Sequence, residues 1–256
     1  MMMTLLLTAA LLGQADERLD LMRHAAESYK FVGDEAKSVP LKLQPDPAFR
    51  LGKQGTGTLK DGAIFLWLDA VGRPEVGAQF FLMGTNEKPQ GIWVHEFSTL
   101  STAPLTATRD GATAWTPKEA GAKFLPIPDA PKPAANASAR LRQMRALAAE
   151  FRAEDDFGNR GWQALRLLPT PINRYGAAGS PIEDGALFAF VTGTDPEVFL
   201  FIEARPGPDG PAWQYGLAPM SRFALKVERK GKLVWSLPYC ANDHPTQTFL
   251  ALPGEP

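Results

Sequence analysis

Few residues in this chain of 256 have the types and spacing that catalysis or ligand binding requires, and His95 is the first candidate. It lies in Trp93-Val94-His95-Glu96-Phe97, where strand alternation places Trp93, His95 and Phe97 on one face and Glu96 on the other. Because imidazole titrates near neutral pH, His95 is a candidate general base or ligand. The alternative is a packing histidine in the core or at the edge of a cleft, since Glu96 points away and forms no dyad with it.

Glu203 and Arg205 form the second candidate site. They follow the apolar run 199–202, and their spacing of two puts both side chains on one face of a strand. A surface ion pair at a strand end is the simplest interpretation, and a buried or partner-facing pair is the alternative. His95, Glu203 and Arg205 are therefore the candidate ligand-binding residues, and no catalytic residue is assigned.

Other patterns are too incomplete to indicate a cofactor or a metal. The glycine-rich segment 52–58 fails the spacing of a phosphate-binding loop, and Cys240 with His244 supplies only two of the ligands that a zinc site needs. No nucleophile elbow, zinc-protease motif or calcium loop occurs in the sequence. We therefore expect no cofactor and no metal.

The composition excludes several classes of protein. The chain has 27 basic and 28 acidic residues and a net charge of -1, so it lacks the basic footprint of a nucleic-acid-binding protein. A hydrophobic content of 45% argues against a disordered chain, and 23 Gly with 23 Pro indicates many turns and short elements. The single Cys excludes an internal disulfide.

The N-terminus is expected to be a targeting segment. Residues 1–12 are uncharged and largely apolar, and small residues at Gly13 and Ala15 suit cleavage by a signal peptidase. The apolar run is shorter than the roughly 20 residues that span a bilayer. We predict a signal peptide at 1–15, with a buried N-terminal helix as the alternative. The mature chain is then expected to have no membrane span and to be secreted, periplasmic or in the cell envelope.

Sequence blocks of the first half recur in the same order in the second half, roughly 120 residues later. The matches include 18–23 with 140–145, 41–47 with 165–171, 61–65 with 184–188, 74–76 with 196–198, and 124–128 with 249–253. We therefore predict one repeat at 16–128, a proline-rich linker at 129–137 and a second repeat at 138–253.

Each repeat has the pattern of a helix followed by a β-meander. Apolar residues at helical spacing, Leu19, Met22, Ala26 and Tyr29 in the first repeat, and Leu141, Met144, Ala148 and Phe151 in the second, predict one amphipathic helix per repeat. Alternating or short apolar runs predict strands, with hairpin turns at 110–111 and 230–231. The predicted fold class is α+β, with two tandem homologous modules, each an N-terminal helix packed on an antiparallel sheet of about five strands. Cystatin-like modules and half-barrels both satisfy this pattern.

Several duplicated residues are interpreted as structural. Arg50 and Arg174 each follow a Pro-x-Pro sequence and are expected to bond carbonyls or carboxylates. Trp115 and Trp235 are expected to anchor the two cores. The glutamates that follow proline at 75 and 197 are interpreted as turn residues before a strand.

The blocks 165–171 and 184–190, together with Thr194-Asp195-Pro196-Glu197-Val198, resemble a group of uncharacterised exported bacterial proteins. The resemblance covers much of both repeats and implies export, but it assigns no catalytic or binding residue.

We therefore expect an exported, non-enzymatic protein that binds a protein or a small ligand between its two modules. We expect a monomer in which the modules pack about a pseudo-two-fold axis. One alternative is an extracytoplasmic hydrolase that uses His95 or the region of Glu203 and Arg205, and another is a structural module of a cell-envelope assembly.

Overall fold

The computed structural model describes residues 16–33, 39–52, 58–84, 87–88, 90–177, 179–207, 210–241 and 244–255. The predicted signal peptide at 1–15 lies outside the described residues, as does most of the glycine-rich segment 52–58. The described chain is rich in antiparallel sheet and has few helices: one at 16–28, α2 (Ala137–Ala148) and a short 3₁₀ turn, η1 (Phe157–Asn159). The predicted α+β class with antiparallel sheets is confirmed, but in place of one sheet of about five strands per module the described residues form two four-stranded and two six-stranded sheets. Among these residues, no helix is long and apolar enough to cross a bilayer.

Two four-stranded sheets have corresponding strand orders, β2-β1-β8-β9 and β12-β11-β18-β19. The strands of the first are β1 (Tyr29–Gly33), β2 (Val39–Pro40), β8 (Leu105–Arg109) and β9 (Ala112–Trp115). The strands of the second are β11 (Phe151–Asp156), β12 (Gln163–Ala164), β18 (Ala224–Arg229) and β19 (Lys232–Leu237).

Two six-stranded sheets also have corresponding orders, β20-β7-β6-β5-β3 and β10-β17-β16-β15-β13, with β4 paired to β5 and β14 paired to β15. The first contains β3 (Lys42–Leu43), β4 (Phe49–Leu51), β5 (Leu59–Leu68), β6 (Pro74–Met83), β7 (Ile92–Thr99) and β20 (Phe249–Gly254). The second contains β10 (Phe124–Pro126), β13 (Arg166–Leu167), β14 (Asn173–Tyr175), β15 (Asp184–Thr192), β16 (Asp195–Gly207) and β17 (Gly210–Pro219).

The two halves of the chain exchange their last strands. We call residues 16–128 the N-terminal half and residues 138–253 the C-terminal half. Strand β10 leaves the N-terminal half and pairs with β17, with Leu125 opposite Tyr215, whereas β20 leaves the C-terminal half and pairs with β7, with Leu252 opposite His95. One edge strand of each six-stranded sheet thus comes from the other half.

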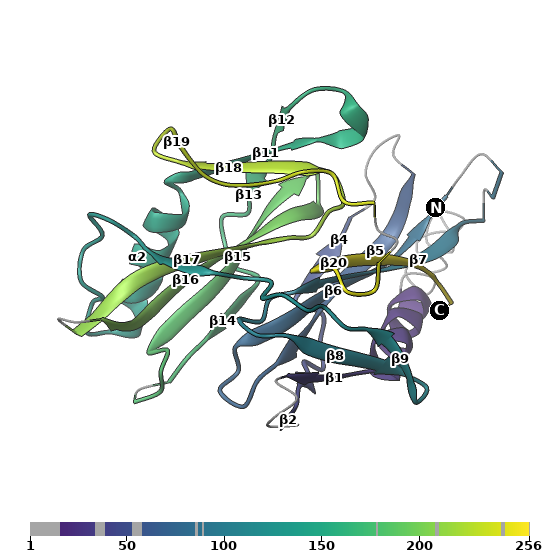
Figure 1. Ribbon diagram of the computed structural model, residues 1–256, viewed down its shortest axis with the longest axis horizontal. Coiled ribbons are helices and arrows are strands. Elements are labelled where there is room, and N and C mark those ends of the chain that lie inside the picture. The colour runs from purple at the N-terminus through teal and green to yellow at the C-terminus, as the bar shows by residue number, and fades with distance from the viewer. Residues whose placement is uncertain are drawn as a thin grey trace, which may run out of the picture.

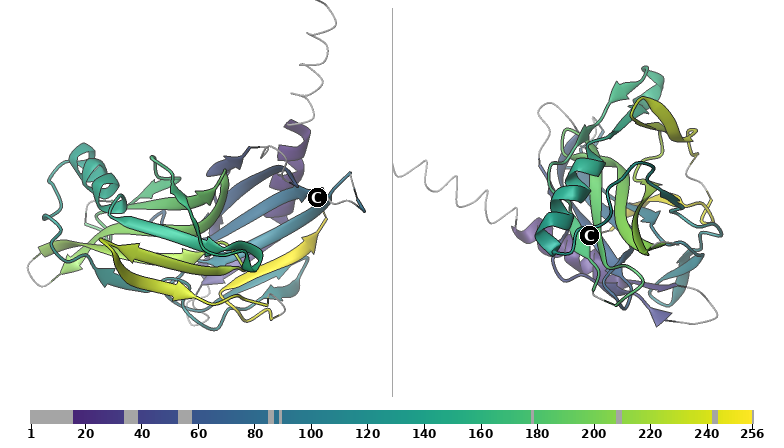
Figure 2. Two further views of the ribbon diagram at one scale, coloured as in Figure 1. Left: turned by 90° about the horizontal axis from the view of Figure 1, so that it is seen from above. Right: turned by 90° about the vertical axis from the view of Figure 1, so that its left-hand side faces the viewer.

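The two helices lie at opposite ends of the molecule, as the views in Figures 1 and 2 agree. The apolar stripe predicted for the first helix faces a core, with Met22 and Ala26 fully buried beside Phe65 of β5. The helix ends at residue 28, however, so Tyr29, predicted as the last residue of that stripe, is the first residue of β1, and Phe151 likewise begins β11. In α2, Met144 and Ala148 are buried in the same way against β15 and β16. The side chain of Asn136 accepts a hydrogen bond from the Ala139 backbone N–H at 2.8 Å and caps the N-terminus of α2.

Each half has its own hydrophobic core, and a third core lies between the two six-stranded sheets with side chains from both halves. The sheets approach so closely that a Cβ added to Gly77 would lie 2.9 Å from Cε2 of Phe199. The central strands β6 and β16 therefore have both faces buried, one against their own half and one against the other half.

Two local predictions are confirmed. Asp110 and Gly111 have φ of 50° and 80°, and Lys230 and Gly231 have φ of 50° and 76°, as two-residue hairpin turns require. The guanidinium of Arg50 donates two hydrogen bonds to Asp61, at 3.0 and 2.7 Å. The guanidinium of Arg174 donates two to Asp184, at 2.9 and 2.7 Å.

Candidate functional site

His95 lies inside the core of the N-terminal half. Its side chain is 0% exposed and packs at 4.7 Å, between ring centroids, on Phe80. Its Nδ1 lies 3.0 Å from the hydroxyl of Tyr29. Strand β20 covers the ring so tightly that a Cβ added to Gly254 would come within 2.3 Å of it. The ring of His95 is therefore closed to solvent in this structure.

The electrostatics of His95 fit a neutral packing residue. Burial, together with the positive charge of Arg109, lowers the pKa of His95 to about 4. The imidazole is therefore uncharged near neutral pH. Because it is enclosed by aromatic rings and bonded to Tyr29, His95 fits the interpretation as a packing histidine.

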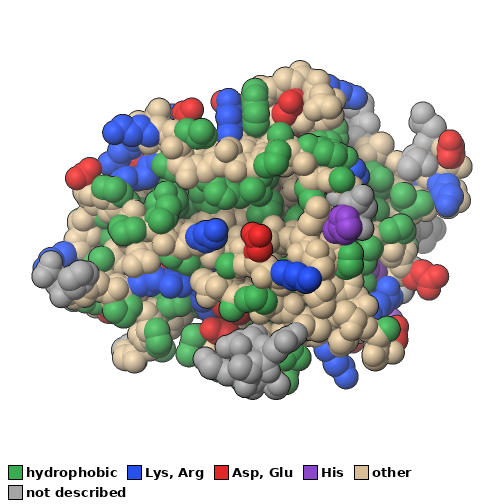
Figure 3. Space-filling view, viewed as in Figure 1, with side chains coloured by type: hydrophobic (Ala, Val, Ile, Leu, Met, Phe, Trp, Pro, Cys, Tyr) green, Lys and Arg blue, Asp and Glu red, His purple; other side chains and the backbone are tan. Residues whose placement is uncertain are grey.

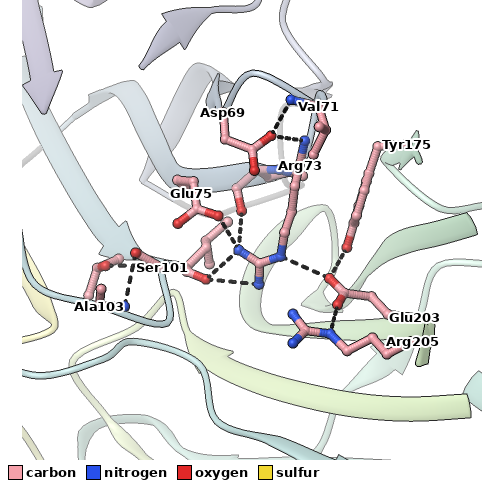
Figure 4. A network of polar contacts seen from close by, with 12 residues as sticks. Asp69, Val71, Arg73, Glu75, Ser101, Ala103, Tyr175, Glu203 and Arg205 are labelled. Carbon is pink, nitrogen blue, oxygen red and sulfur yellow. Dashed lines mark hydrogen bonds and ion pairs between the residues drawn. The ribbon is translucent and has the colours of Figure 1, made fainter. Parts of the chain in front are cut away.

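Glu203 and Arg205 belong to a different network, which joins the two halves (Figure 4). Glu203 is 0% exposed, so it is buried and not the surface charge that its place near a strand end suggested. Its Oε1 accepts hydrogen bonds from Nε of Arg73 at 2.9 Å and from the Tyr175 hydroxyl at 2.5 Å, and its Oε2 accepts one from Nε of Arg205. Glu203 is buried because this face of β16 packs against the other half, whereas Arg205, closer to the strand end, is partly exposed.

Arg73 is the centre of this network. It donates to the carboxylate of Glu75 and to the carbonyl oxygens of Pro74 and Leu100, at 3.2 and 3.3 Å. Its guanidinium also lies over the ring of Phe201, 4.8 Å from the centroid. Every side of the cation is thus occupied by an acceptor or an aromatic face.

The turn before β6 positions Arg73. Oδ1 of Asp69 accepts hydrogen bonds from the backbone N–H groups of Val71 and Arg73, at 2.9 and 2.8 Å, and Gly72 has φ of 83° (Figure 4). This Asx turn directs the Arg73 side chain across the interface. The guanidinium groups of Arg73 and Arg205 contact the carboxylates of Glu75 and Glu203 directly, and we interpret the network as a clamp between the halves.

A second polar cluster lies in a cleft of about 410 Å³ to which both halves contribute. Carboxylates of Glu96 on β7 and of Asp195 and Glu197 on β16 line it, and we call it the acidic cleft. The other lining residues include the apolar side chains of Phe81, Met83, Phe157, Met220, Phe223 and Leu252, and the polar side chains of Ser221 and Arg222.

The carboxyl groups of the acidic cleft hold their protons strongly. Burial and the nearby Asp195 raise the pKa of Glu96 to about 8. Burial raises the pKa of Asp195 to about 6. Burial and Asp195 raise the pKa of Glu197 well above its ordinary value. Perturbed carboxyl groups gathered in a cleft are typical of functional sites.

Gln79 on β6 is hydrogen-bonded to the carboxyl groups of the acidic cleft through Asp195. It is 1% exposed, and its Nε2 donates to Oδ1 of Asp195 at 2.7 Å across the interface. Gln79 lies opposite Glu96 in the register of β6 and β7, so the two side chains share a face of the sheet. Within the described residues, Oε1 of Gln79 has no hydrogen-bond partner.

Apolar surface alone does not distinguish the acidic cleft from other hollows. A cavity of about 490 Å³ shares Ser221 and Phe223 with it and is lined mainly by residues 237–240 and 246–249. Hydrophobic side chains are also widespread on the face drawn in Figure 3. The gathering of three carboxyl groups, with Glu197 buried and Glu96 and Asp195 half-buried, is what distinguishes the acidic cleft.

The predicted site residues do not come together: His95 packs in the core of the N-terminal half, whereas Glu203 and Arg205 belong to the clamp. Sequence reasoning missed Arg73, Gln79 and Asp195, and it interpreted Glu75 and Glu197 as turn residues. One sequence signal was available: Arg73-Pro74-Glu75 and Asp195-Pro196-Glu197 occupy matching places in the two repeats with opposite charges at their first positions.

Comparisons with protein-family models, with curated proteins and with solved structures found no match to this chain. Within the part of the chain that the structure describes, no group of three or more His, Cys, Asp or Glu side chains is arranged to hold a metal ion. The interpretation of the site therefore depends on its own geometry.

Proposed function

We propose that this chain is an exported, non-enzymatic protein that binds a small ligand in the acidic cleft, between two duplicated modules. The observation that carries this proposal is the meeting of Glu96, Asp195 and Glu197 in a cavity shared by the two halves. Buried carboxyl groups lower the stability of a protein unless they are paired, and they are typical of sites where a ligand completes the pairing. The cavity volume lies in the range of small-molecule sites.

The proposed duplication is supported by features that occur once in each half. The sheets have corresponding strand orders, and each half carries the same bidentate Arg–Asp pair. The last strand of each half is donated to the other half's sheet. In a duplicated fold, corresponding sites start alike and diverge, so a clamp at one site and an open cleft at the other are consistent with one origin. Export and a monomeric state with pseudo-two-fold packing remain part of the proposal.

Binding is favoured over hydrolysis because the other candidate residues are already engaged. The ring of His95 is enclosed beneath β20, and each carboxylate oxygen of Glu203 already accepts hydrogen bonds. Neither group can meet a substrate without local unfolding.

The test uses three probes of similar shape and different charge: benzylamine, benzyl alcohol and phenylacetate. We expect at least one of them to bind with an affinity of about 10 mM or tighter in ligand-observed NMR. The variant Thr58→Trp places an indole at an exposed lining position of the cleft, and we expect it to weaken that binding by roughly tenfold.

The control is Thr113→Trp, which adds the same indole to an exposed position of β9. It should bind like the unmodified protein. Failure of all three probes to bind, or equal binding to the Thr58→Trp protein, would contradict the proposed function.

A further inference from the structure

The clamp and the acidic cleft are built on the same backbone framework. In the clamp, the backbone N–H of Leu100 donates to the carbonyl of Glu75 at 2.8 Å. In the cleft, the backbone N–H of Met220 donates to the carbonyl of Glu197 at 2.7 Å.

A serine follows in both places, and its Oγ accepts a backbone hydrogen bond. Ser101 accepts one from the N–H of Ala103 at 3.1 Å, and Ser221 accepts one from the N–H of Phe223 at 3.3 Å. The two sites therefore present a glutamate, a serine and a strand end in the same arrangement.

The two frameworks differ in the residue that precedes Pro-Glu: it is Arg73 in the clamp and Asp195 in the cleft. In the clamp, Arg73 neutralises Glu75 and fills the space beside it. In the cleft, Asp195 stands in the matching place, and the charges that act on Glu197 come from Asp195, Asp155 and Glu96. The guanidinium of Arg222, which acts on Glu96, is bonded to the hydroxyl of Tyr239. The acidic cleft thus keeps the glutamate of the clamp and replaces its arginine with an aspartate.

The unpartnered oxygen of Gln79 is an independent indication of the missing group. Gln79 is almost fully buried, and its amide nitrogen is already bonded to Asp195. Among the residues that the structure describes, its carbonyl oxygen has no hydrogen-bond donor. A buried acceptor without a donor is destabilising, so a ligand whose N–H group reaches this oxygen gains binding energy there.

We infer that the acidic cleft binds an organic cation, an ammonium or guanidinium group on an apolar body, in the place that the Arg73 guanidinium occupies in the clamp. The inference rests on the proposed function. The cation would pair with Asp195 and Glu197 and donate to Oε1 of Gln79. Its apolar body would lie against Phe81 and Met220, which line the cleft.

The experiment measures the binding of benzylamine and benzamidine by isothermal titration calorimetry, with benzyl alcohol and phenylacetate as the neutral and anionic counterparts. We expect both cations to bind at least roughly tenfold more tightly than the alcohol, because a charge-assisted hydrogen bond contributes more than one tenfold step. Asp195→Asn and Glu197→Gln should each weaken cation binding by roughly tenfold. The control Glu228→Gln, on β18, should leave it unchanged.

A second variant tests the comparison with the clamp directly. Asp195→Arg places a guanidinium beside Glu197, as Arg73 stands beside Glu75. We expect this protein to lose measurable benzamidine binding while it retains the melting temperature of the unmodified protein or exceeds it. If Asp195→Arg fails to fold, the Asn and Gln variants decide the question, because Asn can still accept the hydrogen bond from Gln79.

The outcomes separate the two proposals. If benzyl alcohol or phenylacetate binds as tightly as the cations, or if cation binding survives in Asp195→Asn and Glu197→Gln, the inference of a cationic ligand is wrong and the proposed function stands. If no probe of any charge binds, the proposed function is wrong as well.

Discussion

The clamp between the two halves allows a quantitative test through Arg73→Met. Methionine keeps most of the apolar stem and removes the guanidinium. The substitution leaves Glu203, which is 0% exposed, with Arg205 and Tyr175 as its partners among the described residues, and it removes the arginine that is paired with Glu75.

The magnitude follows from this burial. Removing one member of a buried ion pair costs about 3–5 kcal/mol, because the other charge remains buried. The remaining bonds from Arg205 and Tyr175 reduce the cost, whereas the lost contact with the ring of Phe201 adds to it. We therefore expect Arg73→Met to lower the free energy of unfolding by about 3 kcal/mol.

The assay is urea denaturation monitored by tryptophan fluorescence. An unchanged m-value shows that the variant and the unmodified protein expose the same surface on unfolding, so their free energies of unfolding can be compared. The control is Arg23→Met, which removes the partner of two exposed aspartates and should cost less than about 1 kcal/mol. In the double variant Arg73→Met/Glu203→Gln, the combined loss should be smaller than the sum of the single losses by at least about 1 kcal/mol. A loss below about 1 kcal/mol for Arg73→Met, or strict additivity in the double variant, would refute the interpretation of the network as a clamp.

Two further predictions concern stability. Trp115→Ala should lower the free energy of unfolding by about 3–5 kcal/mol, because this side chain is 1% exposed. Trp235 is only partly buried, so Trp235→Ala should lower it by less than about 2 kcal/mol. Equal losses in the two variants would contradict this prediction. Because burial raises the pKa of Glu96 to about 8 from an ordinary value of 4.5, its contribution to stability is fully present below pH 4.5 and is lost as the pH rises through 8. Chemical denaturation between about pH 5 and 8 should therefore show falling stability, with a flatter profile in Glu96→Gln, and an identical profile in both proteins would refute the assignment.

Local features of the fold could be predicted because they depend on residues close in sequence. The helical stripe of Met22 and Ala26 faces the core as expected, since its spacing determines which side of a helix is apolar. The turns at 110–111 and 230–231 have positive φ because a two-residue hairpin requires it.

The candidate site could not be predicted in the same way. Strand alternation correctly separates His95 from Glu96, but it does not say what covers each face. In the structure, β20 covers His95, and the C-terminal half faces Glu96. Gln79 and Asp195 are bonded across the interface although they are far apart in the chain. Such a contact depends on how two sheets pack, which no local pattern specifies.

By itself, the sequence determined the α+β class, the two helices, the hairpins and the presence of matched residues in both halves, because periodicity and turn chemistry act over a few residues. Only the tertiary structure decided which strands are exchanged, which charges are buried and which carboxyl groups share a cavity. The physical reason is that burial and electrostatic pairing belong to the interface between the six-stranded sheets. The sequence Pro-Glu-Val lies at the start of both β6 and β16. In β6 its glutamate, Glu75, is paired with Arg73, whereas in β16 its glutamate, Glu197, lines the acidic cleft.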